Sequence, residues 1–379
     1  MIPYGRQSID DADIEDVCSV LRSDFLTTGP KIEEFEREFA NYVDVKYATA
    51  VSSGTAALHV ACLAAELKMG DCLVTTPLTF AASSNCALYC NARPDFADIT
   101  KNGLIDPKEI EKKLQPDCKI VIPVHYAGFP CDLEIIKELA DANNTIVIED
   151  ACHAVGARYK DSKIGDCKYS DMAVFSFHPV KHITTGEGGM ITTNSKELDD
   201  KLKILRTHGI TKDPERMVRD EGPWYYEMQL LGYNYRMTDI QAALGISQLK
   251  KVEIFVSRRQ EIAKRYDAAF ENNAFLDFLS NDDQGQSSYH LYPILLKDDL
   301  KAQKRVVFET MRKNGLGVQV HYIPVHYHPY YKSLGFEEGL YPVAEDFYER
   351  EISIPLFPAM TEEDIETVIA KVEDSVRLC

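Results

Sequence analysis

Residues 172–189 read MAVFSFHPVKHITTGEGG, an apolar run followed by a turn rich in hydroxyl side chains and glycine. The run at 172–177 predicts a buried strand, and residues 190–193 predict a second strand directly after the turn. Lys181 lies between the two strands, where flexible backbone allows a close approach to a ligand. A lysine just past a buried strand suits Schiff-base chemistry with an aldehyde cofactor, although most lysines in such loops are solvated surface charges.

Five further short apolar runs precede this stretch, and amphipathic patterns separate several of them. The predicted strands are residues 46–51, 72–76, 93–99, 119–125 and 145–149. The predicted helices between them are residues 55–67, 80–89, 107–114 and 133–142. This alternation predicts an α/β fold with a mostly parallel seven-stranded sheet and helices on both faces. Ligands of such sheets bind beyond the carboxyl ends of the strands.

The chain has 379 residues, which exceeds the usual size of one hydrophobic core, so we predict two domains. A long helical stretch begins at a capping box at Thr238 and runs to about residue 270. We place the boundary inside it, with a large domain over residues 1–250 and a smaller α/β domain over residues 251–379. The other predicted elements are helices at 14–21, 31–42, 302–314 and after Thr361, and strands at 289–296 and 317–323.

Residues 208–235 are irregular and rich in aromatic side chains, with Gly-Pro-Trp-Tyr-Tyr at residues 222–226. A packed surface loop and a ligand or subunit contact are both consistent with this composition.

The net charge of −18 argues against a nucleic acid or an anionic membrane as a partner, because phosphate backbones are bound by basic surfaces. The N-terminus is acidic and unlike a signal peptide, and no apolar stretch has the length of a membrane span. The ten cysteines include no CxxC pair, and Cys86 and Cys90 have no second half-site. We therefore expect a cytoplasmic protein with buried, reduced thiols and no zinc site.

Small residues follow the first predicted strand, where residues 51–57 read VSSGTAA. Gly54 allows a tight turn into the next helix, and the first N–H groups of a helix are unpaired and partly positive. Such a helix end binds phosphate, and the hydroxyl group of Thr55 could contribute. An ordinary helix cap is the alternative.

Polar and aromatic side chains follow two other predicted strands. The strand at 145–149 leads into Asp150, and a buried carboxylate there needs a cation or hydrogen-bond donors. A protonated pyridine nitrogen is such a cation, whereas a helix N-cap is the alternative role for Asp150. His153 lies three residues later. Phe80 follows the second strand at the start of a predicted helix, where it either stacks on a planar cofactor or packs in the core.

These strand-end residues together form the set of groups that holds pyridoxal phosphate: a phosphate-binding helix end, a stacking ring, an acid and a lysine. The chain resembles the DegT-type nucleotide-sugar aminotransferases, which share the aspartate-aminotransferase fold. The motifs that carry this resemblance are residues 26–30, 52–58, 149–156, 176–189 and 232–239. The resemblance covers essentially the whole chain and implies pyridoxal 5'-phosphate as the cofactor.

The resemblance also implies roles for individual residues. Lys181 would form the Schiff base with the cofactor, and Asp150 would pair with its pyridine nitrogen. The phosphate would be held by Gly54, Thr55 and Ser176.

Three further roles follow from the same resemblance. Phe80 would stack on the ring, and His153 would lie against the ring or its phenolic oxygen. Asn234 would reach the phosphate from the partner subunit of a homodimer.

Within the family, the chain resembles the 4-aminotransferases of the pseudaminic acid pathway. The similar stretches are residues 1–7, 176–181, 222–226, 290–295 and 320–331. This resemblance implies a UDP-linked 4-keto-6-deoxy-N-acetylhexosamine as substrate, aminated at C4 with glutamate as donor and 2-oxoglutarate as the second product. The implied substrate contacts are Tyr4, Asp24, Phe25, Leu26, Thr27, His321, Tyr322, Ile323 and Pro324. His182 is a departure, because some of these enzymes have proline after the lysine.

Four alternatives remain at this point. In the first, the substrate is another 3-keto or 4-keto nucleotide sugar. In the second, the chain is a non-catalytic sensor with the same fold. A dehydratase on this fold has histidine in place of the lysine, and Lys181 argues against it, although His182 makes the register worth checking. A metal site at His321, His326 and His328 lacks a nearby carboxylate or thiolate.

Overall fold

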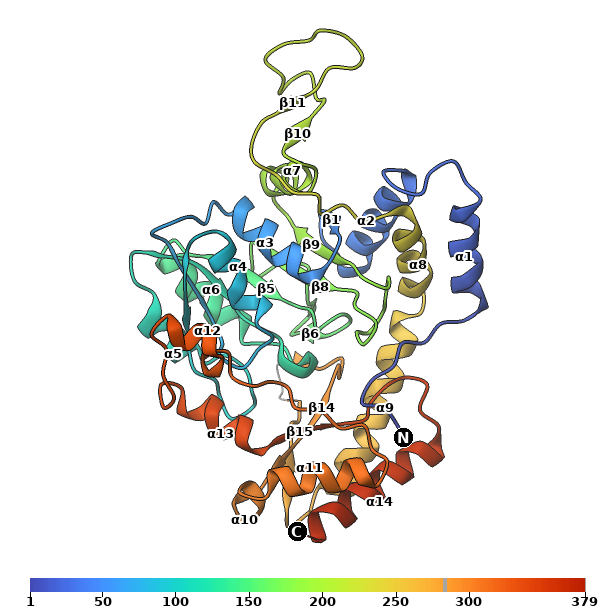
Figure 1. Cartoon of the computed structure of the whole chain (residues 1–379), viewed down its shortest axis with the longest axis vertical. Helices are drawn as coiled ribbons and strands as arrows, with labels where there is room; N and C mark the ends of the chain where they lie inside the picture. The colour runs from blue at the N-terminus through green and yellow to red at the C-terminus, as the bar shows by residue number, and fades with distance from the viewer. Residues whose placement is uncertain (282–284, 379) are drawn as a thin grey trace.

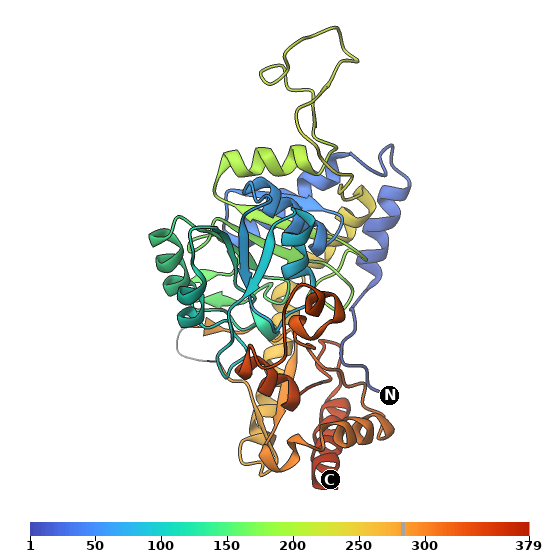
Figure 2. The same ribbon diagram turned by 60° about the vertical axis from the view of Figure 1, so that its left-hand side comes forward.

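The computed structural model describes residues 1–281 and 285–378, and its centre is a seven-stranded sheet (Figures 1 and 2). The strand order is β1-β9-β8-β5-β4-β2-β3. The strands are β1 Tyr47–Val51, β2 Cys72–Thr75, β3 Arg93–Phe96, β4 Cys118–Ile122, β5 Ile146–Asp150, β8 Met172–Ser176 and β9 Gly189–Thr193. Only β9 among them runs antiparallel to its neighbours. The mostly parallel sheet of seven strands is confirmed.

Helices cover both faces of this sheet because side chains alternate along each strand. In β4, Ile120 and Ile122 pack with one apolar cluster and Val121 packs with the other. Helices α3 Gly54–Ala64, α4 Ala82–Tyr89 and α7 Lys196–Leu205 contribute to the first cluster. Helices α2 Pro30–Val43, α5 Pro107–Lys113, α6 Leu133–Ala142 and α8 Asp239–Leu249 contribute to the second. Helix α1 Asp11–Leu21 packs against α8.

The C-terminal part forms a third apolar cluster around an antiparallel sheet in the order β12-β14-β15. Its elements are β12 Leu276–Phe278, β14 Tyr292–Leu296, β15 Glu351–Ile354, α9 Val252–Phe270, α10 Asp298–Lys301, α11 Lys304–Lys313, α12 Pro329–Ser333, α13 Pro342–Arg350 and α14 Glu362–Arg377. The short strands β6 Arg158–Tyr159, β7 Ser162–Lys163 and β13 Gly285–Gln286 form a separate small sheet. The division into domains at residue 250 stays a prediction.

Two sequence-based expectations for this part differ from the structure. The helical stretch from Thr238 divides into α8 and α9, with Lys250 and Lys251 between them. Residues 317–323 form no strand, because their backbone hydrogen-bond partners belong to two different segments, the N-terminus and β15. Gly317 N–H donates to Ile2 at 2.7 Å, and Gln319 makes an isolated bridge to Ser353.

Residues 208–235 leave the body of the molecule as a long arm, visible at the top of Figures 1 and 2. Strands β10 Ile210–Thr211 and β11 Glu227–Met228 pair at its stem. Trp224 is 72% exposed and Leu231 is 74% exposed. A packed surface loop is therefore not what this segment forms, and its apolar side chains are available for contact with another molecule.

Within residues 1–281 and 285–378, no helix is both long and apolar enough to cross a bilayer. The nine described cysteines are free. In the same ranges, no three His, Cys, Asp or Glu side chains are grouped to hold a metal ion. Of the histidines considered for a metal, His321 lies 2.9 Å from Ser353 and His326 lies 2.9 Å from Glu345, so these two have separate partners.

Candidate active site

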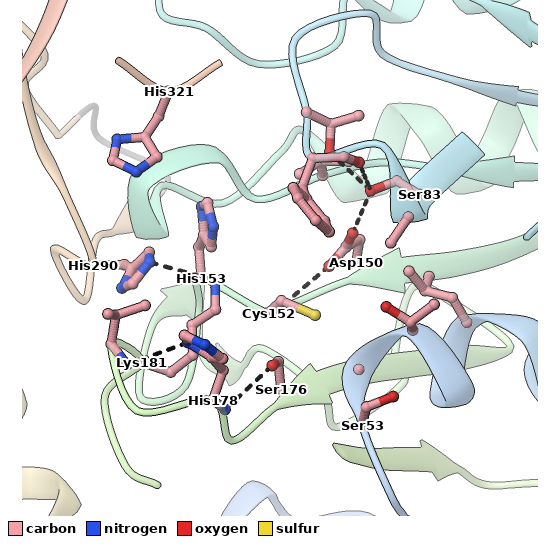
Figure 3. Close-up of a pocket in the computed structure, with 18 of the residues that line it drawn as sticks. Ser53, Ser83, Asp150, Cys152, His153, Ser176, His178, Lys181, His290 and His321 are labelled. Atoms are coloured by element: carbon pink, nitrogen blue, oxygen red, sulfur yellow. Dashed lines mark hydrogen bonds between the residues drawn. The ribbon is translucent and has the colours of Figure 1, made fainter. Parts of the chain in front are cut away.

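A cavity of about 420 Å³ opens at the carboxyl ends of the parallel strands (Figure 3). The predicted site residues that line it are Tyr4, Gly54, Thr55, Phe80, Asp150, His153, Ser176, Lys181, His321 and Tyr322. The sheet order brings the ends of β1, β5 and β8 to one edge, so residues far apart in sequence meet there.

One wall of the cavity is the N-terminus of α3. The Ser53 hydroxyl caps this helix by accepting a hydrogen bond from Ala56 N–H at 3.1 Å. A β-carbon at Gly54 would lie 2.9 Å from the β-carbon of Ser176, so glycine permits the close approach of α3 to β8. The first N–H groups of α3, with the hydroxyl groups of Thr55 and Ser176 beside them, suit a phosphate group.

Asp150 ends β5 in the opposite wall and is almost completely buried. One carboxylate oxygen accepts a hydrogen bond from the Ser83 hydroxyl at 2.7 Å, and the other accepts from Cys152 N–H at 3.1 Å. No helix follows Asp150, so it is not a helix N-cap. Each oxygen keeps a further lone pair, which suits a cationic ring nitrogen.

Lys181 lies in a loop that closes through Phe177 N–H and Gly188 O at 2.9 Å. Phe39 packs against Phe177 at 5.5 Å between ring centroids, which fixes the start of this loop. Burial lowers the pKa of Lys181, and the nearby Cys152 and Asp150 act in the opposite direction. A lower pKa increases the fraction of neutral amine, which is the nucleophilic and basic form.

The next residue, His182, does not line the cavity. Its Nε2 atom lies 3.1 Å from the carbonyl oxygen of Ser288, inside the protein. Lys181 and not His182 therefore faces the cavity, which argues against the register of the dehydratases.

Three residues that sequence reasoning missed contact the predicted ones. Ser83 and Cys152 hold Asp150, as described above. His290 Nε2 lies 3.4 Å from Lys181 Nζ, and its ring lies 4.3 Å from that of His153 (Figure 3). Burial lowers the pKa of both histidines well below the usual value, so both rings are neutral. His290 falls in the stretch 290–295, which resembles the pseudaminic acid enzymes, but no local pattern connects it with Lys181.

His153 also contacts Tyr322, with 3.0 Å between Nε2 and the tyrosine hydroxyl. The Nδ1 atoms of His153 and His290 are buried and have no hydrogen-bond partner among the described residues. Buried polar atoms without partners are rare and call for a ligand or water. Together with the helix end, the carboxylate and the buried amine, this donor and acceptor set fits pyridoxal phosphate.

Several predicted residues do not line this cavity, namely Asp24, Phe25, Leu26, Thr27, Asn234, Ile323 and Pro324. Asn234 is exposed at the base of the arm, where it bridges to Thr207. Residues 24–27 are exposed next to α8, and Thr27 bridges to Thr238. The chain alone does not bring these residues to the cavity.

Comparisons with known proteins agree with this geometry. The model of the DegT/DnrJ/EryC1/StrS aminotransferase family matches residues 7–373. The chain is 42% identical to the UDP-4-amino-4,6-dideoxy-N-acetyl-beta-L-altrosamine transaminase of Campylobacter jejuni, over 97% of this chain and 96% of that protein.

Solved structures are also similar over the full length. Helicobacter pylori PseC, an aminotransferase involved in the biosynthesis of pseudoaminic acid, matches with a TM-score of 0.94 and 32% identity over 100% of both chains. The Streptococcus pneumoniae sugar aminotransferase Spr1654, described as putative and solved in a PMP form, matches with a TM-score of 0.94 and 30% identity over 100% of both chains. By its sequence motifs, its fold and the family model, this chain belongs to the DegT/DnrJ/EryC1/StrS aminotransferase family.

Proposed function

We propose that this aminotransferase moves an amino group from glutamate to C4 of a UDP-linked 4-keto-6-deoxy-N-acetylhexosamine, a reaction of the type used in pseudaminic acid synthesis. The observation that carries the chemistry is the placement of Lys181 and Asp150 in one cavity beside the N-terminus of α3. The choice of sugar is supported by the names of relatives at 42% and 34% identity.

Pyridoxal phosphate is the cofactor, and when bound it supplies an electrophilic carbon and a ring that accepts negative charge. Gly54, Thr55 and Ser176 would hold its phosphate. The negative charge of the Asp150 carboxylate would keep a proton on the ring nitrogen, and two donors hold the carboxylate in place. Phe80 is 62% exposed at the cavity and would stack on the ring.

Lys181 moves the proton in both half-reactions. The buried amine is neutral more often than an exposed one, so it removes a proton from the α-carbon of glutamate. It delivers a proton to C4 of the sugar in the second half-reaction. The neutral His290 ring accepts a hydrogen bond from the amine when it is free, which keeps the amine within reach of the reacting carbon.

We further propose a homodimer in which Asn234 of the partner subunit completes the phosphate site. The proposal is supported by the exposed position of Asn234 outside its own cavity and by the exposed apolar side chains of the arm. Exposed apolar patches of this kind are typical of interaction surfaces.

The dimer proposal predicts the effect of Asn234→Asp. A carboxylate against the phosphate repels it, so activity and cofactor retention should both fall at least roughly 10-fold. Refolding this variant together with Lys181→Ala should restore about a quarter of the wild-type activity, because random mixing leaves one intact site in half of the dimers. Activity that stays near zero after mixing would place Asn234 and Lys181 of the same chain in one site, whereas unchanged activity of Asn234→Asp alone would remove Asn234 from the site.

The function itself is tested with a panel of nucleotide sugars. The purified enzyme, loaded with cofactor and supplied with glutamate, should turn over the UDP-linked 4-keto-6-deoxy-N-acetylhexosamine with a kcat/KM at least roughly 100-fold above that for 3-keto isomers. Mass spectrometry and NMR identify the products. A 3-keto sugar or another nucleotide as the best substrate would replace the proposed sugar and leave the aminotransferase assignment intact.

A further inference from the structure

Three hydrogen-bonded side chains connect the interior of the C-terminal sheet with the cavity wall. Glu351 and Ser353 lie on β15 and are completely buried. The Ser353 hydroxyl donates to Glu351 Oε1 at 2.5 Å, and its oxygen lies 2.9 Å from His321 Nδ1. The backbone N–H of His321 donates to Glu351 Oε2 at 2.8 Å. Both oxygens of the carboxylate therefore accept a hydrogen bond.

The protons available to these groups determine which nitrogen of His321 carries hydrogen. The serine hydroxyl has a single proton, which it donates to the carboxylate, so its oxygen can only accept from the ring. Nδ1 then carries the ring proton. Burial lowers the pKa of His321 to about 3, so the ring is neutral and Nε2 has a free lone pair.

The free lone pair is available to a ligand. Nε2 has no hydrogen-bond partner among the described residues. It is not one of their fully buried atoms, and His321 lines the cavity. Tyr4 and Tyr322 pack against the ring at 5.4 and 5.0 Å between centroids, and both also line the cavity. The ring is thus fixed in orientation as well as in tautomer.

We propose that Ser353 and Glu351 are positioning residues that fix the Nδ1–H tautomer of His321, so that Nε2 accepts a hydrogen bond from a hydroxyl group of the sugar. This inference rests on the proposed function, since the ligand is the nucleotide sugar. A fixed acceptor selects a sugar with a hydroxyl group at that position over one with a keto or ether oxygen, because two acceptors repel.

The charge of Glu351 sets the direction of the hydrogen bonds that join Glu351, Ser353 and His321. Burial raises the pKa of Glu351 to about 7, and Lys304 on α11 acts in the opposite direction. The other titratable side chains that its charge influences are Tyr126 and Tyr322. A proton on Oε1 would be donated to Ser353, whose hydroxyl would then donate to Nδ1 and leave the ring proton on Nε2. At a pH well above 7, the His321 ring therefore donates to Ser353 and Ser353 donates to Glu351.

The tautomer is measured by 15N NMR of histidine-labelled holoenzyme at such a pH, with the His321 signals assigned by their loss in His321→Asn. Wild type should show a protonated Nδ1. Glu351→Gln should reverse these hydrogen bonds and move the ring proton to Nε2. The amide oxygen must face the backbone N–H of His321, so the amide NH₂ donates to Ser353 and the Ser353 hydroxyl donates to Nδ1. Ser353→Ala should give a mixture of the two His321 tautomers. Glu309→Gln, an exposed glutamate on α11, is the matched control and should change neither signal.

The same variants are assayed for turnover. Glu351→Gln should raise the KM for the sugar roughly 10-fold and leave the KM for glutamate unchanged, since one hydrogen bond to the sugar is lost. A wild-type ring protonated on Nε2, an unchanged tautomer in Glu351→Gln, or equal changes in both KM values would overturn the proposal. The NMR result needs no substrate, so a wrong proposed function is recognised separately, by wild-type enzyme that aminates no sugar of the panel.

Discussion

Replacement of Lys181 by alanine is expected to lower both half-reactions by roughly 10⁴-fold, because one side chain provides both the covalent link to the cofactor and the proton transfer. The loop that carries Lys181 is closed by backbone hydrogen bonds and by aromatic packing behind it, so the variant should fold normally. Each half-reaction is measured alone, with glutamate or with the amino sugar as the single substrate.

A second readout separates loss of chemistry from loss of fold. Lys181→Ala should lose the visible absorbance of the covalently bound cofactor and release the cofactor on dialysis. Lys168→Ala removes an exposed lysine that precedes β8, outside the loop of Lys181, and it should keep both activity and absorbance. An active Lys181→Ala enzyme with unchanged absorbance would show that another residue holds the cofactor.

Asp150→Asn is expected to lower kcat at least roughly 100-fold, because a neutral amide no longer keeps a proton on the pyridine nitrogen. The substitution is isosteric. The amide oxygen can still accept from Cys152 N–H, which donates to the carboxylate at 3.1 Å, and the amide NH₂ can donate to the Ser83 hydroxyl. That hydroxyl has the carbonyl oxygen of Phe80 at 3.2 Å as another acceptor, so the fold should lose little stability.

Ser83→Ala separates the charge of Asp150 from its hydrogen-bonded position. It removes one donor from Asp150 and leaves the charge, so kcat should fall far less than in Asp150→Asn. Asp141→Asn, on the exposed side of α6, controls for the loss of a negative charge and should leave kcat unchanged. Equal losses in Asp150→Asn and Ser83→Ala would mean that Asp150 acts through its position in the fold and not through its charge.

The sheet and its helices were predictable because each strand and helix carries its own periodic pattern. The errors arose where distant segments decide the backbone conformation. Residues 317–323 look like a strand, but Ile2 takes one of their hydrogen bonds and Ser353 takes another. The break between α8 and α9 lies at Lys251, whose ammonium group pairs with Asp10 and the buried Asp13 on α1. No pattern within residues 238–270 contains that information.

The candidate site was predictable for the same local reason: Gly54, Asp150 and Lys181 each lie at or after the carboxyl end of a strand, at one edge of the sheet. His290 was not, because it reaches Lys181 from 109 residues away, across the junction with the C-terminal sheet. Ser353 was not either, since a serine in a buried strand gives no sign of the histidine that it contacts. The roles of residues 24–27 and of Asn234 depend on a second subunit and stay predictions.

The motif at residues 232–239 also has a structural role, which the resemblance did not indicate. The Asp239 carboxylate accepts hydrogen bonds from Gly29 N–H at 2.8 Å and from Lys31 N–H at 2.9 Å, which caps the start of α2. Helix α2 in turn supports the Lys181 loop through Phe39. This contact connects the turn at residues 26–30 with the motif at residues 232–239.

The central claim is that nitrogen passes from glutamate to C4 of a nucleotide-linked keto-sugar in the cavity of Lys181 and Asp150. The most direct measurement follows [15N]glutamate through one reaction with the UDP-linked 4-keto-6-deoxy-N-acetylhexosamine and locates the label by NMR. We predict that the 15N is bonded to C4 and that 2-oxoglutarate forms in equal amount. Label at another carbon, or no labelled sugar from enzyme that has its cofactor bound, would contradict the account.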